Sequence, residues 1–148
     1  ERGDVQAIKE GLRDGTIDVI ATDHAPHATQ EKQQEFTEAP FGIVGLETAL
    51  SLTLALVDEG VLTLESAVDK LATAPAKAFS LNAGTLAVGA PADVAIVDPN
   101  REWQVDPSRF RSKSRNTPFA GWKVKGRVTT TIVSGRVVFE LDRSERQA

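Results

Sequence analysis

The hydrophobic pattern of the chain changes its period near Gly15. Before that residue, apolar side chains recur at helical spacing behind Asp4, a suitable N-cap, and predict a helix over residues 4–14. After it, residues 16–21 form a short β-branched run that predicts a buried strand. A helix followed at once by a buried strand is half of an α/β repeat.

Two further helices are predicted in the middle of the chain. Leucine and valine side chains form an apolar stripe over residues 46–60, and Gly60 ends that helix. Thr63 can cap the next helix, and a short further turn is expected from Pro75 to Phe79.

Strand-like stretches dominate the rest of the sequence. Residues 92–97 and 128–133 are rich in β-branched side chains and are bounded by Gly and Pro turns. Ser134-Gly135 predicts a tight hairpin that leads into residues 136–139.

The chain is therefore expected to divide near residue 84. Residues 1–83 predict an α/β portion, and residues 84–148 predict an all-β portion. One strand and a few helices cannot close a barrel of alternating strands and helices, which takes eight strands and about 250 residues. If residues 1–83 are the last portion of such a barrel, the rest of it lies elsewhere.

Composition narrows the class of protein. With 148 residues, of which 41% are hydrophobic and 26% charged, the chain has the composition of a soluble globular protein with one hydrophobic core. Its 17 basic and 21 acidic residues give a net charge of -4, which argues against nucleic-acid binding. No apolar stretch approaches the roughly 20 residues of a membrane span, so a cytoplasmic protein is expected. The absence of Met predicts a piece of a longer protein, and the absence of Cys leaves only His and carboxylate ligands for any metal.

The candidate chemistry follows the predicted strand, in residues 22–27, which hold both histidines of the chain. Active sites of α/β barrels are built at this end of the strands. Asp23 alone could be a metal ligand, a general base or the cap of a turn, and an Asp after a strand is most often a turn residue. His24 and His27 beside it make a cluster able to bind a metal or an anion. The polar loop over residues 25–42 is long enough to be functional or disordered.

The sequence around these residues resembles a known family. Residues 17–27 resemble the last-strand motif of dihydroorotases of the class I bacterial type, and residues 39–48 resemble the loop and helix that follow it. Hydantoinases and allantoinases also end this strand in Ser or Thr, Asp and His, but Ala25-Pro26-His27 favours dihydroorotase. The resemblance continues through residues 89–94, a motif shared widely in the amidohydrolase superfamily, and residues 116–119, so it covers nearly the whole chain.

The resemblance implies a fold and a reaction. The fold would be the C-terminal part of a metal-dependent TIM-barrel amidohydrolase with one or two zinc ions, plus a small all-β, sandwich-like domain. The reaction would be the reversible cyclisation of N-carbamoyl-L-aspartate to L-dihydroorotate in pyrimidine biosynthesis.

The resemblance also implies roles for four residues. Asp23 would bind the metal and act as the general base, taking a proton from metal-bound water and returning it to the amide nitrogen. His27 would contact the substrate carboxylate, and Phe41 and Gly42 would present backbone groups to the ring. In the alternative reading, Phe41 is an ordinary core aromatic and Gly42 a helix-start residue.

The chain departs from the family in what it lacks. It has no His-x-His pair, so the remaining zinc ligands would lie outside it and the chain alone would be inactive. Two alternatives stay open: a catalytically silent dihydroorotase-like scaffold for aspartate transcarbamoylase, and a cyclic amidohydrolase of the hydantoinase or allantoinase type. Candidate partners are a small-molecule substrate, the rest of the same polypeptide, a second copy in a homodimer, and aspartate transcarbamoylase.

Overall fold

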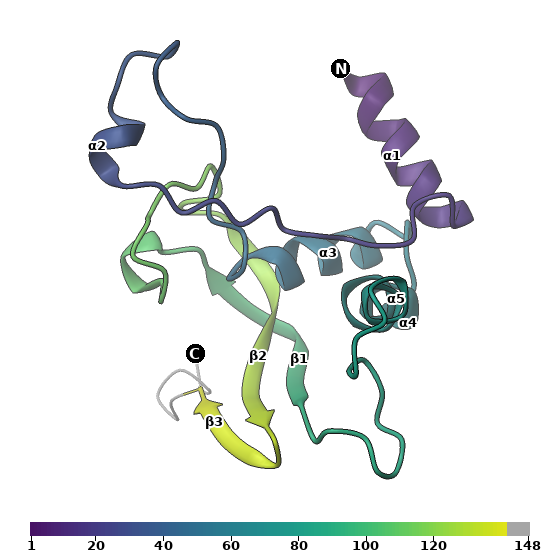
Figure 1. The fold of residues 1–148 in the computed structure, drawn as a ribbon. Helices are drawn as coiled ribbons and strands as arrows, with labels where there is room; N and C mark the ends of the chain where they lie inside the picture. The colour runs from purple at the N-terminus through teal and green to yellow at the C-terminus, as the bar shows by residue number, and fades with distance from the viewer. Residues whose placement is uncertain (142–148) are drawn as a thin grey trace.

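The computed structural model describes residues 1–141. In Figure 1 the helix α1 stands at the upper right, a long loop reaches to the upper left, and a three-stranded sheet lies below. The elements, in chain order, are α1 (Arg2–Asp14), α2 (Thr29–Lys32), α3 (Ala49–Asp58), α4 (Leu64–Val68), the π-helix η1 (Asp69–Thr73), α5 (Ala74–Ala78), β1 (Val94–Gln104), the 3-10 turn η2 (Pro107–Arg109), β2 (Lys123–Val133) and β3 (Arg136–Glu140). No helix in this described part of the chain is long and apolar enough to span a membrane.

The predicted helices are confirmed, with shifted ends. Helix α1 ends at Gly15, whose φ of 85° is the left-handed conformation typical of a helix stop. The Thr63 hydroxyl accepts the Ser66 N–H at 3.1 Å and caps α4 as expected. Helix α3 begins later than predicted, at Ala49, because the residues before it form contacts with other parts of the chain. A core cluster is formed by Leu12 of α1, Ala67 of α4, and Val61 and Leu62 between α3 and α4. Leu56 and Val57 of α3 pack against it.

The predicted strand over residues 16–21 is wrong for this chain. These residues are in no strand, and in the described residues no second barrel strand lies beside them to form a ladder. Their polar groups bond to a helix instead. The Ile20 N–H donates to the Lys70 carbonyl at 3.0 Å, and the buried Lys70 ammonium donates to the Ile17 carbonyl.

The sheet is antiparallel in the order β1-β2-β3. The predicted hairpin is confirmed: Ser134 and Gly135 both have positive φ, 50° and 74°, as a two-residue type I′ turn requires. Strand β1 runs beyond the predicted residues 92–97, and its register shifts between Asp98 and Glu102, around a proline that cannot donate to the ladder. The three strands form one sheet rather than a two-layer sandwich within the described residues, and the division near residue 84 stays a prediction.

Helix α3 packs against the sheet at β2. The Ser51 hydroxyl donates to the Gly126 carbonyl at 2.7 Å, and the Trp103 indole N–H donates to the same carbonyl at 3.0 Å. Gly126 has a φ of 86°, and a Cβ at this position would lie 2.2 Å from Leu54 Cδ1. The close approach of helix and strand therefore requires glycine here.

Replacing Gly126 by alanine should destabilise the protein by roughly 2–4 kcal/mol, because it adds an overpacking cost to the cost of a left-handed residue. The measurement is denaturant unfolding of wild type and variant in the same polypeptide. Gly135→Ala is the matched control, since its φ is also positive but nothing lies within 4 Å of its Cβ position. Equal losses for the two variants would mean that α3 does not pack on β2 at this point.

Candidate active site

Two segments outside the helices and strands meet at the candidate site: the Asp23 segment (residues 22–27) and the Gly42 segment (residues 41–46). His24 and Ile43 form a parallel bridge, and the Ala25 N–H donates to the Ile43 carbonyl at 2.9 Å. This contact is a single bridge and not a ladder of backbone hydrogen bonds. The two segments are therefore held together mainly by side-chain hydrogen bonds, and glycines let them approach closely.

Glycines allow the two segments to approach. Gly42 has a φ of 108°, and a Cβ added there would lie 2.4 Å from the Ala25 Cβ. A Cβ at Gly45 would lie 2.9 Å from the Thr22 carbonyl oxygen. Gly42 therefore permits a close approach of Ala25, and its expected role toward the substrate ring stays a prediction.

The structure brings two of the four predicted site residues, His27 and Gly42, together. His27 is half-buried, and its Nε2 lies 3.5 Å from the position that a Gly42 Cβ would occupy. Asp23 is exposed, with a φ of 43°, and its carboxylate has no partner among the described residues. Phe41 is 94% exposed. Phe41 is therefore no core aromatic, and Gly42 is no helix-start residue, because α3 begins at Ala49.

A neighbouring carboxylate orients His27. Its Nδ1 lies 3.7 Å from Glu31 Oε2, one helical turn further along the chain. The same Glu31 oxygen accepts the Ala28 N–H at 2.8 Å, which fixes the carboxylate at the start of α2. The arrangement leaves the Nε2 edge of His27 directed at the Gly42 segment.

Two bracing residues were missed from the sequence. The backbone carbonyl of Asn116 accepts the Val44 N–H at 2.9 Å, and its side-chain amide donates to the Gly42 carbonyl at 2.8 Å. Lys32 donates to the Pro40 and Gly42 carbonyls at 2.7 and 3.1 Å. Asn116 lies in a motif that signalled the family, but no local pattern shows a contact across 74 positions. Lys32 lies in a charged run that is typical of a solvated loop.

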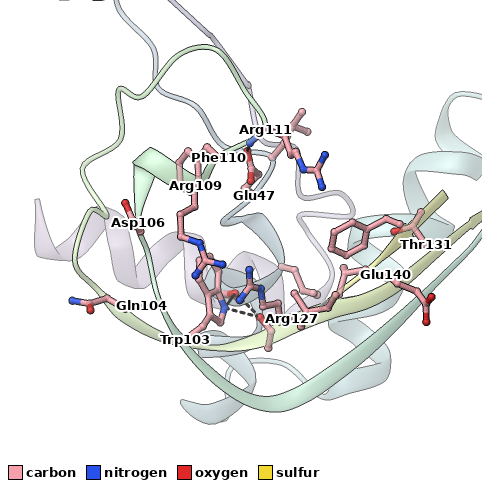
Figure 2. A pocket seen from close by; sticks show the side chains of 17 residues that line it. Glu47, Trp103, Gln104, Asp106, Arg109, Phe110, Arg111, Arg127, Thr131 and Glu140 are labelled. Carbon is pink, nitrogen blue, oxygen red and sulfur yellow. Dashed lines mark hydrogen bonds between the residues drawn. The ribbon is translucent and has the colours of Figure 1, made fainter. Parts of the chain in front are cut away.

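A separate cavity of about 540 Å³ lies between α3, the sheet and the turn η2. Figure 2 shows the guanidinium groups of Arg109 and Arg127 turned toward the same space beside Trp103. Burial, followed by the positive charges of Arg109 and Arg101, lowers the pKa of Arg127 below its ordinary value. None of the predicted site residues lines this cavity, so it is distinct from the Asp23 segment.

Comparison with known proteins assigns the family. The amidohydrolase family matches residues 1–138, which is most of the chain. The chain belongs to the amidohydrolase family. This amidohydrolase chain is 54% identical over 141 residues to a dihydroorotase of Syntrophus aciditrophicus, covering 95% of this chain and 33% of that protein. It is 58% identical over 138 residues to a dihydroorotase of Syntrophotalea carbinolica, covering 93% and 32%.

Solved amidohydrolase structures share its fold. An L-hydantoinase (dihydropyrimidinase) from Arthrobacter aurescens superposes with a TM-score of 0.83 at 38% identity, over 90% of this chain and 31% of that one. A D-hydantoinase from a Bacillus species gives 0.85 at 26% identity, over 95% and 32%. The mixed α/β, amidohydrolase-type fold is thereby confirmed. The chain spans about a third of the length of the curated relatives it matches, and the expectation that this is their C-terminal third stays a prediction.

Amidohydrolases are generally metal-dependent. Within residues 1–141 no group of three or more His, Asp or Glu side chains could hold one. His24 uses its Nδ1 to accept backbone N–H groups, and Asp23 is a single carboxylate. A catalytic zinc normally takes three protein ligands, so the described residues do not form a metal site by themselves.

Replacing Gly42 by alanine should separate the two paired segments, because the added Cβ meets Ala25 and the φ is unfavourable for alanine. We expect the Ala25 amide, which donates to Ile43, to exchange its hydrogen about tenfold faster or more. Mass-spectrometric hydrogen exchange on the peptide covering residues 22–27 measures this. Gly89→Ala, with φ 89° and open space around its Cβ position, should leave that exchange unchanged. Unchanged exchange in both variants would contradict the pairing.

Proposed function

We propose that the longer protein to which this chain belongs is a dihydroorotase, which reversibly cyclises N-carbamoyl-L-aspartate to L-dihydroorotate in pyrimidine biosynthesis. The observation that carries the proposal is the pairing of the Asp23 segment with the Gly42 segment, which brings His27 to Gly42, in a chain 54–58% identical to curated dihydroorotases. Identity to the hydantoinase structures is lower, 26–38%, which favours dihydroorotase over the hydantoinase alternative.

The proposed fold is a TIM barrel to which residues 1–83 contribute, with residues 84–148 in a small β domain. The proposed cofactor is one or two zinc ions, bound by Asp23 and by ligands outside this chain. Zinc in such a site would supply Lewis-acid activation of a carbonyl and of water. The proposed partners are the small-molecule substrate, the rest of the polypeptide and, as in the scaffold alternative, aspartate transcarbamoylase or a second copy. We place the protein in the cytoplasm.

Asp23 is proposed as the acid–base residue. Its carboxylate is exposed and has no partner in the described chain, so it is free to accept a proton. When the dihydroorotate ring opens, a water molecule adds to the amide carbonyl carbon and gives a proton to Asp23, and the C–N bond breaks as Asp23 delivers that proton to the nitrogen. In the cyclisation direction the same carboxylate takes that proton back.

His27 is proposed to bind a substrate carboxylate that does not react. Its Nδ1 lies 3.7 Å from the Glu31 carboxylate, so the Nδ1 edge is turned toward α2. The Nε2 edge, beside Gly42, then faces the place where Phe41 and Gly42 would offer backbone groups to the ring. Binding and chemistry would thus be divided between the two ends of one short segment.

Asp23→Asn in the full-length enzyme should lower kcat for dihydroorotate by about a hundredfold or more, because the amide keeps the shape but cannot carry the proton. Asp18→Asn is the matched control, an exposed carboxylate on the same extended stretch with no assigned role. The measurement is the steady-state kcat of both variants compared with wild type, and Asp18→Asn should leave it unchanged. If Asp23→Asn keeps more than about a tenth of wild-type activity, a barrier change of only about 1.4 kcal/mol, Asp23 is not the base.

His27→Ala should raise KM for dihydroorotate about tenfold while kcat falls less, because a contact made equally in ground and transition states appears mainly in KM. The lost charge-assisted hydrogen bond is worth about 1.5–3 kcal/mol. Steady-state kinetics, after the zinc content has been measured, tests this. An unchanged KM removes His27 from the site, whereas loss of zinc makes it a ligand. Parallel assays with hydantoin and allantoin separate the alternative substrates, and no turnover of any of them by wild type favours the silent scaffold.

A further inference from the structure

His24 lies between the two residues assigned to chemistry and binding, yet no role followed for it from the sequence. Its imidazole is half-buried, and its Nδ1 accepts two backbone N–H groups, from Gly45 at 3.1 Å and from Leu46 at 3.4 Å. The contact spans 21 positions of sequence and joins the Asp23 segment to the Gly42 segment. We propose that His24 is a positioning residue that, through these two hydrogen bonds, fixes the backbone of Asp23 and thereby aims its carboxylate. The inference rests on the proposed function.

The backbone of Asp23 needs such support. Its φ of 43° is a left-handed conformation that L-residues adopt at a cost, although Asp tolerates it better than most. A residue stays in this region only when its surroundings hold it there. On the N-terminal side, the Thr22 carbonyl is packed against Gly45, so closely that a Cβ there would clash. On the C-terminal side, His24 and the Ala25 N–H are bonded to the Gly42 segment.

Gly45 takes part on both sides of Asp23. Its missing Cβ admits the Thr22 carbonyl at one side, and its N–H holds the His24 ring at the other. Both neighbours of Asp23 therefore contact Gly45: the Thr22 carbonyl packs against it, and the His24 ring accepts its N–H. The Asp23 side chain itself makes no such contact within the described residues. Within the described chain nothing bonds the Asp23 carboxylate itself, so what this chain contributes to its direction comes from the contacts of Thr22 and His24 with Gly45.

The role requires an acceptor at the Nδ1 position. An imidazole whose Nδ1 accepts an N–H carries its proton on Nε2, so the ring acts as a neutral acceptor toward the Gly42 segment. An asparagine amide oxygen lies at about the distance of Nδ1 from the backbone, whereas a glutamine oxygen lies at about the distance of Nε2. Asparagine should therefore replace the contact, and glutamine should not.

The test uses the full-length, zinc-loaded protein and three variants, His24→Ala, His24→Gln and His24→Asn. For dihydroorotate we expect His24→Ala and His24→Gln to lower kcat about tenfold or more, with KM changed by less than about threefold and with zinc content unchanged. His24→Asn should restore kcat to within about threefold of wild type. A residue that merely fills space would not distinguish asparagine from glutamine in this way.

A second measurement does not depend on turnover. Hydrogen exchange of the Gly45 and Leu46 amides, followed in metal-free protein, should be about tenfold faster in His24→Gln and near wild type in His24→Asn. If His24→Ala does not fold, the comparison of His24→Gln with His24→Asn still tests the proposed hydrogen bonds. Equal kcat or equal exchange in the asparagine and glutamine variants overturns the inference, and loss of zinc in both makes His24 a ligand instead. If wild type does not turn over dihydroorotate, the proposed function fails, while the exchange measurement still tests the contact.

Discussion

The pairing of the Asp23 segment with the Gly42 segment is the constraint on which the candidate site depends. An extended stretch of backbone must bond its N–H and carbonyl groups to something, and in the described chain only one parallel bridge serves it. Side chains supply further hydrogen bonds to the backbone of the Gly42 segment. The His24 ring accepts the Gly45 N–H, and Lys32 and Asn116 donate to the Gly42 carbonyl. Two glycines are the condition for this approach, because a Cβ at either position would meet the facing segment.

The sheet contributes to the same constraint from a distance. Helix α3 follows directly after the Gly42 segment, and Ser51 in its first turns bonds to the Gly126 carbonyl of β2. The connection between β1 and β2 carries Asn116, and Val105 and Phe110 in this connection form a buried cluster with Val44. The sheet is thus held on α3 and also reaches the site, which explains why a motif about 70 positions away can brace the Gly42 carbonyl.

Local signals predicted much of the fold, and non-local contacts were beyond them. The Thr63 cap, the Gly15 stop and the hairpin at Ser134 depend on residues within a few positions, so their residue types suffice. The strand over residues 16–21 failed for the opposite reason, since a strand exists only beside a partner, and here the neighbour is Lys70 of a π-helix. In the site, the motif pointed to His27 and Gly42, which lie near one another, and the roles of Asp23 and Phe41 stay predictions. It did not predict what holds them, because the partners of His24, Lys32 and Gly42 are backbone groups in other segments.

The two histidines, three positions apart, differ in their surroundings rather than in their chemistry. Ala25 and His27 lie toward Gly42 itself, whereas His24 bonds further along the same segment, to the amides of Gly45 and Leu46. His24 therefore holds the Asp23 segment to the Gly42 segment, whereas His27 lies at the candidate site. Asp23 differs from both histidines, because its φ is positive and its carboxylate has no partner in the described chain.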